Sequence, residues 1–330
     1  MNKLKFRKTL VILSIVILGW VYHPVYAEPS AAVNQSSGVI RVALTGSDVS
    51  GCGSVDTPCK SIQYAVNSAA SGDTILVAAG TYTYPAVGKL NSECYLYTTT
   101  EHPPVVCIRS KHLTMRGGYS TSNWSTADPI ANPTVIDGQN QHRGISLIGW
   151  SATEAKASLH MTGFTVQNGL AQGHSSGTDY QTGAYGGGML ALQAPIALEN
   201  VRFVSNRAIG GNTTANGGGP GVGGGLAINR GPDGTVSTLE NVVFENNEAC
   251  GGTGPVRGGS ALGGGFLAYY AVLEANHITL TNNTAKAGDS NGSGVYIWSA
   301  DALGGGAAIH RNKRNSMNVW LASSCKRQSP

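Results

Sequence analysis

Apolar residues recur in two short patterns through the second half of the chain. The first is a glycine triplet followed by an apolar stretch, with copies 37, 40 and 41 residues apart at Gly186, Gly223, Gly263 and Gly304. The second follows the first three triplets and places apolar residues on alternate positions before an asparagine. Two matched patterns at one spacing predict a repeat array, in which each unit buries its apolar face against its neighbours.

The second pattern predicts ladders of like residues. Its copies are Val201, Phe203 and Asn206, then Val242, Phe244 and Asn247, then Ile278, Leu280 and Asn283. We expect the apolar residues to stack in the core and the asparagines to stack at a corner, where Asn tolerates a left-handed backbone and bonds its own copies. The glycine triplets permit tight corners with positive φ. The glycine-rich inserts at 210–221 and 250–259 are expected to be loops that project from one edge.

The first half contains a different set of elements. A strand is predicted over 39–44, and an amphipathic helix is predicted within 61–70, because Ile62, Ala65, Val66 and Ala69 fall at helical spacing. A turn at Gly72 and Asp73 ends the helix, and a strand over 74–77 follows.

This stretch carries a family resemblance. Residues 59–82 resemble the amino-terminal cap of exported right-handed parallel β-helix proteins of the pectin-lyase-like superfamily, in which a short helix plugs the open end of the solenoid. The segments 113–119, 134–138 and 161–169 look like successive coils. The Gly-Gly-Gly and Phe-x-x-Asn patterns are similar to those of bacterial surface proteins with polymorphic-outer-membrane-type repeats.

The resemblance covers about residues 39–310 and implies the fold class. That class is all-β, a single-stranded right-handed parallel β-helix, with an N-terminal helical cap and first coil at 39–83 and the glycine repeats at 186–310. Two other repeat folds fit less well. A propeller would need a Gly-His to Trp-Asp spacing, which is absent. A calcium-binding nonapeptide roll would need aspartates at the places held by Ala191, Ile228, Ala268 and Ile309.

The two ends differ from the repeats. Residues 1–27 combine a basic start, an apolar core over 10–21 and a small residue at Ala27, which predicts a cleavable secretory signal peptide; an uncleaved anchor is the alternative. Residues 28–38 are expected to be a flexible linker, and no further membrane span is expected in the mature chain. Residues 311–330 are either a degenerate last coil, with Ser324 where an asparagine is expected, or a basic tail.

The net charge of +4 comes from the ends. All 18 acids lie in residues 28–310, against 13 of the 22 basic residues, so this part of the chain carries about −5. That balance argues against a nucleic-acid surface, which needs a basic face.

Six cysteines in an exported chain are expected to be oxidised. We pair Cys52 with Cys59 and Cys94 with Cys107, because each pair brackets a short segment. A third bridge between Cys250 and Cys325 is a weaker hypothesis, given the distance between them in sequence. No Cys-x-x-Cys occurs and no histidine stands at ligand spacing, so no metal site is predicted.

Catalytic machinery is hard to find. A glycoside hydrolase needs clustered carboxylates, whereas the acids are scattered and no Asp-Asp pair occurs. The Arg-x-Pro-x-x-Arg and Trp-x-Asp-His patterns of pectate lyases are absent too, and Ca²⁺ would be a cofactor only under that lyase alternative. The weak catalytic candidates are Asp137, His142 and Arg143 in one polar turn, and His174, Asp179 and Tyr180 in one insert. Surface loops explain both groups at least as well.

Aromatic residues are the candidates for binding. Tyr185, Tyr269, Tyr270 and Trp298 could stack on sugar rings, although coil packing explains them equally. His160 and His277 are expected to face outward without a catalytic role. We therefore expect an exported, monomeric and non-catalytic protein at the cell surface or outside the cell, which binds glycan or another surface along its solenoid. The alternatives are a divergent polysaccharide lyase or hydrolase acting on an acidic polysaccharide, and a fragment of a larger surface protein.

Overall fold

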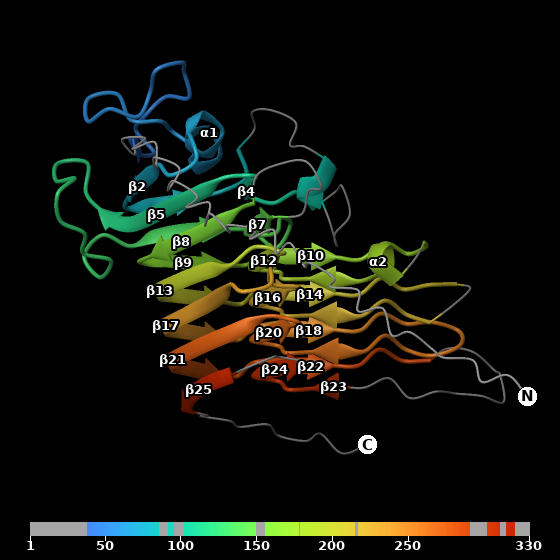
Figure 1. Cartoon of the computed structure of the whole chain (residues 1–330). Coiled ribbons are helices and arrows are strands. Elements are labelled where there is room, and N and C mark those ends of the chain that lie inside the picture. The colour runs from blue at the N-terminus through green and yellow to red at the C-terminus, as the bar shows by residue number, and fades with distance from the viewer. Residues whose placement is uncertain are drawn as a thin grey trace, which may run out of the picture. The chain divides into compact units, whose positions relative to one another are not determined.

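The structure is a computed structural model that describes residues 38–85, 92–95, 102–149, 156–177, 179–214, 217–290, 302–310 and 315–320. Nearly all of its regular elements are short strands, which pair in parallel over four sheets. Strands far apart in sequence lie next to one another, so the chain climbs by one rung at each repeat (Figure 1). The described part of the chain is therefore a parallel β-solenoid, as the sequence predicts.

The first sheet contains β1 (Val39–Val42), β2 (Thr74–Ala78), β5 (His112–Tyr119), β8 (Ser158–Thr162), β13 (Ile196–Val204), β17 (Val236–Glu245), β21 (Val272–Thr281) and β25 (Asn315–Trp320), joined by β3 (Gly80–Tyr82), β6 (Thr134–Asp137) and β9 (Phe164–Gln167). The second contains β4 (Val106–Arg109), β7 (Ile145–Ile148), β12 (Met189–Leu192), β16 (Leu226–Asn229), β20 (Phe266–Tyr269) and β24 (Ala307–His310). The core lies between these two sheets.

Two smaller sheets lie to the side of the core. One contains β10 (Leu170–Gln172), β14 (Arg207–Ile209), β18 (Glu248–Cys250) and β22 (Thr284–Lys286). The other contains β11 (Ala184–Tyr185), β15 (Gly221–Val222), β19 (Ala261–Leu262) and β23 (Ala302–Leu303). The short helices are α1 (Ile62–Ser68), α2 (Asp179–Thr182) and the 3₁₀ helix η1 (Ser92–Tyr95).

The apolar ladders form as predicted. Phe203 is opposite Phe244 in the register of β13 and β17, and Phe244 is opposite Leu280 in that of β17 and β21. The rings of Phe203 and Phe244 stack with centroids 5.1 Å apart, and both side chains are fully buried. Val201, Val242 and Ile278 form a parallel ladder two residues earlier.

The asparagine ladder also forms. Asn247 Oδ1 accepts hydrogen bonds from the Asn206 backbone N–H at 3.0 Å and from Asn206 Nδ2 at 2.9 Å. Asn283 Oδ1 accepts the same two bonds from Asn247, at 3.0 and 2.9 Å. The predicted left-handed backbone is displaced by one position, since the positive φ belongs to the residues before the ladder, namely Ser205, Asn246 and Asn282. The ladder asparagines use their side chains at the corner, and the preceding residue makes the turn.

The glycine triplets turn the corners as expected. The first glycine of each triplet has a φ between 60° and 63°. The second and third glycines are needed for close approach instead: a Cβ on Gly187 would overlap the carbonyl of Arg207, and one on Gly188 would overlap the carbonyl of Gly225. Each triplet therefore meets two separate steric demands.

The described residues of the glycine-rich inserts pack against one another, which the sequence analysis did not foresee. Each insert leaves along β10, β14 or β18 and returns along β11, β15 or β19, and we call the segments 173–185, 210–222 and 251–262 the glycine flange. Backbone bonds link the outgoing and returning layers: Gly219 N–H donates to Gly211 O, Gly252 N–H to Gly219 O, and Gly259 N–H to Gly252 O, at 2.7–2.9 Å. A Cβ on Gly219, Gly252 or Gly259 would overlap a carbonyl oxygen of the preceding rung, namely Thr182 O, Gly211 O or Gly219 O. The flange thus packs backbone against backbone, and only glycine fits between its layers.

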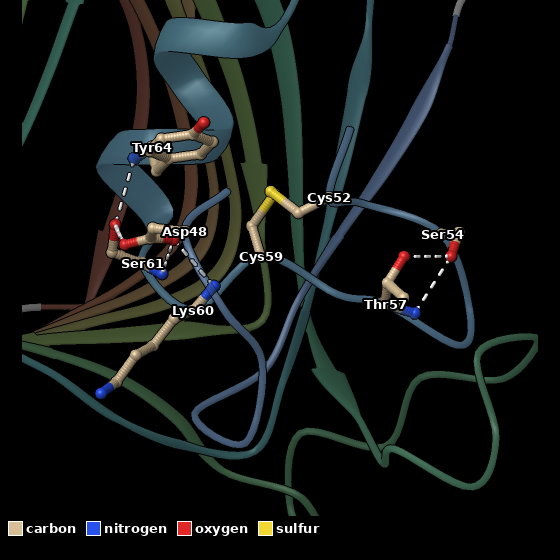
Figure 2. The surroundings of a disulfide bond; sticks show 8 residues. All are labelled: Asp48, Cys52, Ser54, Thr57, Cys59, Lys60, Ser61 and Tyr64. Carbon is tan, nitrogen blue, oxygen red and sulfur yellow. Dashed lines mark hydrogen bonds between the residues drawn. A yellow bond between two sulfur atoms is a disulfide. The ribbon is translucent and has the colours of Figure 1, made fainter. Parts of the chain in front are cut away.

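Helix α1 forms where the sequence predicts it. Ser61 caps it, because its Oγ accepts a hydrogen bond from Tyr64 N–H, and Asp48 accepts bonds from Lys60 N–H, Ser61 N–H and Ser61 Oγ (Figure 2). At the other end Lys111 Nζ donates to the carbonyls of Val66, Asn67 and Ala69 at 2.6–3.1 Å. The helix places Ile62, Ala65 and Val66 in the core cluster. Its role as a cap, and the handedness of the solenoid, remain predictions.

Two of the three proposed disulfides are present, Cys52–Cys59 and Cys94–Cys107. The loop between Cys52 and Cys59 also covers the edge of β1, since Arg41 N–H donates to Gly53 O and Cys59 N–H donates to Arg41 O. Cys250 is a half-buried thiol whose pKa rises to about 12 because of burial. Its proposed partner Cys325 lies outside the described residues. Among the described residues no helix is long and apolar enough to span a membrane.

Candidate functional site

A groove lies beside the glycine flange, along the outer face of the second sheet. Side chains alternate along these strands, so Phe266 and Ala268 enter the core while Leu267 and Tyr269 face outward. The groove has a volume of about 450 Å³. Residues in or next to β11, β15 and β19 line one side of it: Tyr185, Pro220, Val222, Ser260 and Leu262. The ends of β16 and β20 contribute Asn229, Arg230, Leu267 and Tyr269, and an insert contributes Arg257.

Two of the tyrosines that the sequence singles out share this groove. Tyr185 stands at the end of β11 and packs against the outward apolar residues Ile148, Leu190 and Leu192. Tyr269 ends β20, and its ring meets that of Tyr270 edge-on at 4.4 Å between centroids. Tyr270 is 40% exposed. The fourth binding candidate, Trp298, lies outside the described residues.

A second hollow continues the groove. It has a volume of about 520 Å³ and is lined by Arg230, Asp233, Tyr269 and Tyr270, together with the turn residues 231–234 and 271–272. Because Arg230 and Tyr269 line both hollows, they form one continuous surface along the ends of β16 and β20.

Polar groups enter this surface at positions that the sequence analysis did not single out. Asn229 is 5% exposed, and its Oδ1 accepts no hydrogen bond from a described residue. Arg230 follows it with a φ of 55°, and both Arg230 and Arg257 are exposed. The register pairs Asn229 with Tyr269. Aligning the residues that follow each glycine triplet would therefore have placed Asn229 and Arg230 beside Tyr269 and Tyr270.

Arg143 is not placed as the sequence suggests. Instead of lying in a polar surface turn, it is fully buried. Its guanidinium donates from Nε to Gly186 O and from Nη2 to Tyr185 O, each at 3.0 Å, and from Nη1 to Ser146 Oγ at 3.1 Å. Burial lowers the pKa of Arg143 to about 9, so the side chain is still protonated at neutral pH. A side chain enclosed in this way cannot reach a substrate.

The other members of that turn have contacts of their own. Asp137 accepts hydrogen bonds from Gln139 N–H, Gln167 Nε2 and Asn168 Nδ2, which makes it a corner residue of the coil. His142 stacks on Tyr84 with ring centroids 4.5 Å apart, and its Nδ1 lies 3.2 Å from Pro103 O. Burial lowers the pKa of His142, the bond to Pro103 opposes this, and nearby His102 lowers it further. The turn therefore does not gather its three candidates around a substrate site.

The second catalytic group lies in the flange. His174 is half-buried, and its backbone N–H donates to Gln181 O at 2.8 Å. Asp179 and Tyr180 begin α2, but their side chains are not among those described. This group stays a prediction.

Carboxylates are dispersed in the described structure. Glu245 in β17 pairs with Arg202 at 3.0 Å, and Glu248 in β18 pairs with Arg207 at 2.7 Å, in a different sheet. His277 is exposed as expected and lies 2.8 Å from Glu240 Oε1 on the outer face of the first sheet, while His160 is half-buried there. Over the described ranges, no three His, Cys, Asp or Glu residues gather in a way that could hold a metal ion.

Comparisons with known proteins add little to this geometry. No protein-family model matches the chain. No curated protein matches its sequence. A solved rhamnogalacturonan lyase is similar at 11% identity and a TM-score of 0.25 over 83% of this chain, which spans 62% of the length of that lyase. A likeness at that level carries no argument about the site, so the function is argued from the groove.

Proposed function

We propose that this protein is an exported, non-catalytic binding protein that holds a glycan in the groove beside the glycine flange. The observation that carries the proposal is the joint lining of one groove by Tyr185, Tyr269 and the guanidinium groups of Arg230 and Arg257. The predicted signal peptide supports export. So do the two disulfides, because such bonds persist in oxidising compartments.

Tyrosine suits a sugar ligand for a physical reason. A sugar ring has an apolar face of C–H groups and a rim of hydroxyls, and a tyrosine ring offers an apolar face with a polar tip. Tyr185 and Tyr269 come from different rungs, so a chain of sugars lying along the groove could meet both.

The polar groups favour an anionic glycan. Arg230 and Arg257 contribute two positive charges to the combined surface and Asp233 one negative charge, whereas residues 28–310 are acidic overall. Guanidinium groups bind carboxylates and sulfates through paired hydrogen bonds. Among the described residues the Asn229 Oδ1 acceptor has no hydrogen-bond donor. An unpaired buried acceptor costs about 1–3 kcal/mol, which a ligand hydroxyl could recover after rotation of the amide.

The same lining argues for binding without turnover. Among the residues that line the two hollows, Asp233 is the one carboxylic acid, and there is no histidine. Hydrolysis of a glycosidic bond needs two carboxyl groups in most enzyme families. Lyases that work through Ca²⁺ need several carboxylates to hold the ion.

The test uses the mature chain from Glu28 with alginate, hyaluronan, dextran sulfate and neutral dextran as probes. We expect retention of an anionic probe and an affinity up to about tenfold weaker for Tyr269→Ala, since an aromatic stack contributes about 0.5–1.5 kcal/mol. Arg257→Gln should weaken binding of anionic probes more than of neutral dextran.

The controls are Tyr64→Ala and Arg202→Gln, which change the same residue types outside the groove. Equal losses for groove and control variants would refute the site. Production of unsaturated ends or of reducing sugar by the wild type, with or without Ca²⁺, would refute the non-catalytic proposal and favour a divergent lyase or hydrolase.

A further inference from the structure

We propose that Arg143 is the positioning residue of the groove: its side chain replaces a missing backbone rung and holds Tyr185 in place. The inference rests on the proposed function of the groove for its consequence in binding, but its structural content stands separately. It assigns a role to a residue that would otherwise look like a catalytic candidate.

The glycine triplets at the edge of the flange share a pattern of backbone hydrogen bonds that repeats from rung to rung. The first glycine of each of the first three triplets donates its N–H to the residue that precedes the next triplet: Gly186 to Val222 O at 2.9 Å, Gly223 to Leu262 O at 2.8 Å, and Gly263 to Leu303 O at 3.0 Å. The middle glycine donates to the first glycine of the next triplet, as Gly224 does to Gly263 O at 3.2 Å. The rungs at Gly263 and Gly304 therefore each receive two such donors from the rung before them, and the rung at Gly223 receives the Gly186 N–H at Val222 O.

The rung that contains Tyr185 has no such predecessor. The preceding coil makes a tight turn at 138–142, in which His142 N–H donates to Gly138 O at 2.8 Å, and it lacks a long insert. The carbonyls of Tyr185 and Gly186 occupy the positions that accept the two donors in later rungs. Without a substitute, this edge of the flange would lack both.

Arg143 supplies the substitute. The pairing of Ile145 with Met189 places Arg143 opposite Gly187, the middle glycine of the first triplet. Its Nη2 reaches Tyr185 O and its Nε reaches Gly186 O, each at 3.0 Å. One planar guanidinium thus presents two N–H groups where a backbone rung would present two.

The arginine is itself held in place. It is fully buried, and Nη1 donates to Ser146 Oγ, whose hydroxyl donates to Cys94 O at 3.1 Å. Cys94 is fixed by its disulfide to Cys107. The network therefore runs from a covalent bridge to the two carbonyls that flank the left-handed turn at Gly186, where φ is 63°.

Fixing these carbonyls fixes the tyrosine. Tyr185 directly precedes that turn. Its ring packs against Ile148, Leu190 and Leu192 at the side of the groove. A loose corner would let the ring leave this position. Arg143 acts through Tyr185 and touches no ligand.

The experiment measures the mobility of the backbone at 184–186 and the environment of the Tyr185 ring, with no glycan present. Hydrogen exchange is followed across 184–186 in the wild type, Arg143→Met, Arg143→Lys and Ser146→Ala, with Arg202→Met as the control on an exposed arginine. In parallel, the protein carries 3-fluorotyrosine, and the Tyr185 resonance is assigned with Tyr185→Phe.

We expect exchange across 184–186 to be at least about tenfold faster in Arg143→Met than in the wild type, with a shifted Tyr185 resonance. Arg143→Lys should show a smaller change in both, because an ammonium group keeps the charge and part of the hydrogen bonding but lacks the planar fork that presents N–H groups from three separate nitrogens. Ser146→Ala should change both least, and Arg202→Met should match the wild type.

If Arg143→Met does not fold, Arg143→Lys decides. A folded Arg143→Lys or Arg143→Met protein with wild-type exchange at 184–186 and an unshifted Tyr185 resonance would overturn the inference. Neither readout involves a ligand, so this failure is distinguishable from failure of the proposed glycan binding.

Discussion

Replacing Asn247 by alanine should remove the centre of the internal asparagine ladder. The Asn247 side chain is fully buried and makes four hydrogen bonds. Its Oδ1 accepts from the backbone N–H and from Nδ2 of Asn206, and its Nδ2 donates to Phe203 O and to Asn283 Oδ1, all at 2.9–3.0 Å. The variant leaves the Asn206 N–H and the Phe203 carbonyl inside the solenoid without these partners.

The cost follows from those orphaned groups. A buried polar group without its partner costs about 1–3 kcal/mol, so two backbone groups and one amide together predict a loss of about 3–9 kcal/mol. Single domains are stable by about 5–15 kcal/mol, so the variant should lose a large share of the free energy of unfolding.

The measurement is equilibrium unfolding in urea followed by circular dichroism, compared between Asn247→Ala and Asn276→Ala. Asn276 is exposed on β21, so its replacement should change stability by less than about 0.5 kcal/mol. A loss below about 1 kcal/mol for Asn247→Ala, or equal losses for the two variants, would refute the reasoning that the ladder is a buried and satisfied network.

Three further predictions concern the flange, one histidine and the first helix. Gly259→Ala should destabilise the protein by about 3 kcal/mol in thermal unfolding, the upper end for overpacking, because its Cβ would overlap the Gly219 carbonyl. Gly234→Ala, in open space at a φ of 75°, should cost about 1 kcal/mol in the same measurement. Because burial lowers the pKa of folded His142, the unfolded chain binds its proton more tightly, so stability should fall as pH drops below about 6.5, and His142→Phe should flatten that slope in melting temperatures over the same range. Lys111→Met should lower stability by about 1–2 kcal/mol in urea titrations, since the ammonium group bonds three carbonyls at the end of α1; an unchanged midpoint would contradict this.

The ladders could be predicted because their physical demands are local. A repeat that buries Phe203 at one place must bury Phe244 and Leu280 at the matching places, and a buried asparagine finds partners in its own copies. Periodicity therefore gives both the register and the inward positions. It does not place the left-handed turn, which fell one residue earlier, at Ser205 and Asn246.

The flange could not be predicted in this way. Glycine-rich polar segments are usually interpreted as loops, and the packing of residues 210–214 and 217–222 involves backbone atoms of segments about 40 residues away. No side-chain pattern records such contacts, because glycine has no side chain. The signal for such packing is a run of glycines with few larger side chains, and the same run is equally expected for a flexible loop.

The burial of Arg143 and the position of the groove also could not be predicted from local sequence. An arginine in a polar turn is expected at the surface, and its burial depends on the lack of an insert in its own coil and the presence of one in the next. Tyr185 and Tyr269 were recognisable as aromatic candidates from composition alone. Their shared groove, and the polar neighbours Asn229 and Arg257, required the register of the rungs.

The central claim is that the groove beside the flange is the binding surface, and a hydrogen-exchange footprint tests it most directly. The mature protein is labelled with and without the glycan that it retains from the panel. The account predicts slower exchange at 184–186, 229–231, 257–260 and 269–271, with no change on the outer face of β13, β17 and β21. Protection confined to that outer face, with the groove unchanged, would contradict the account.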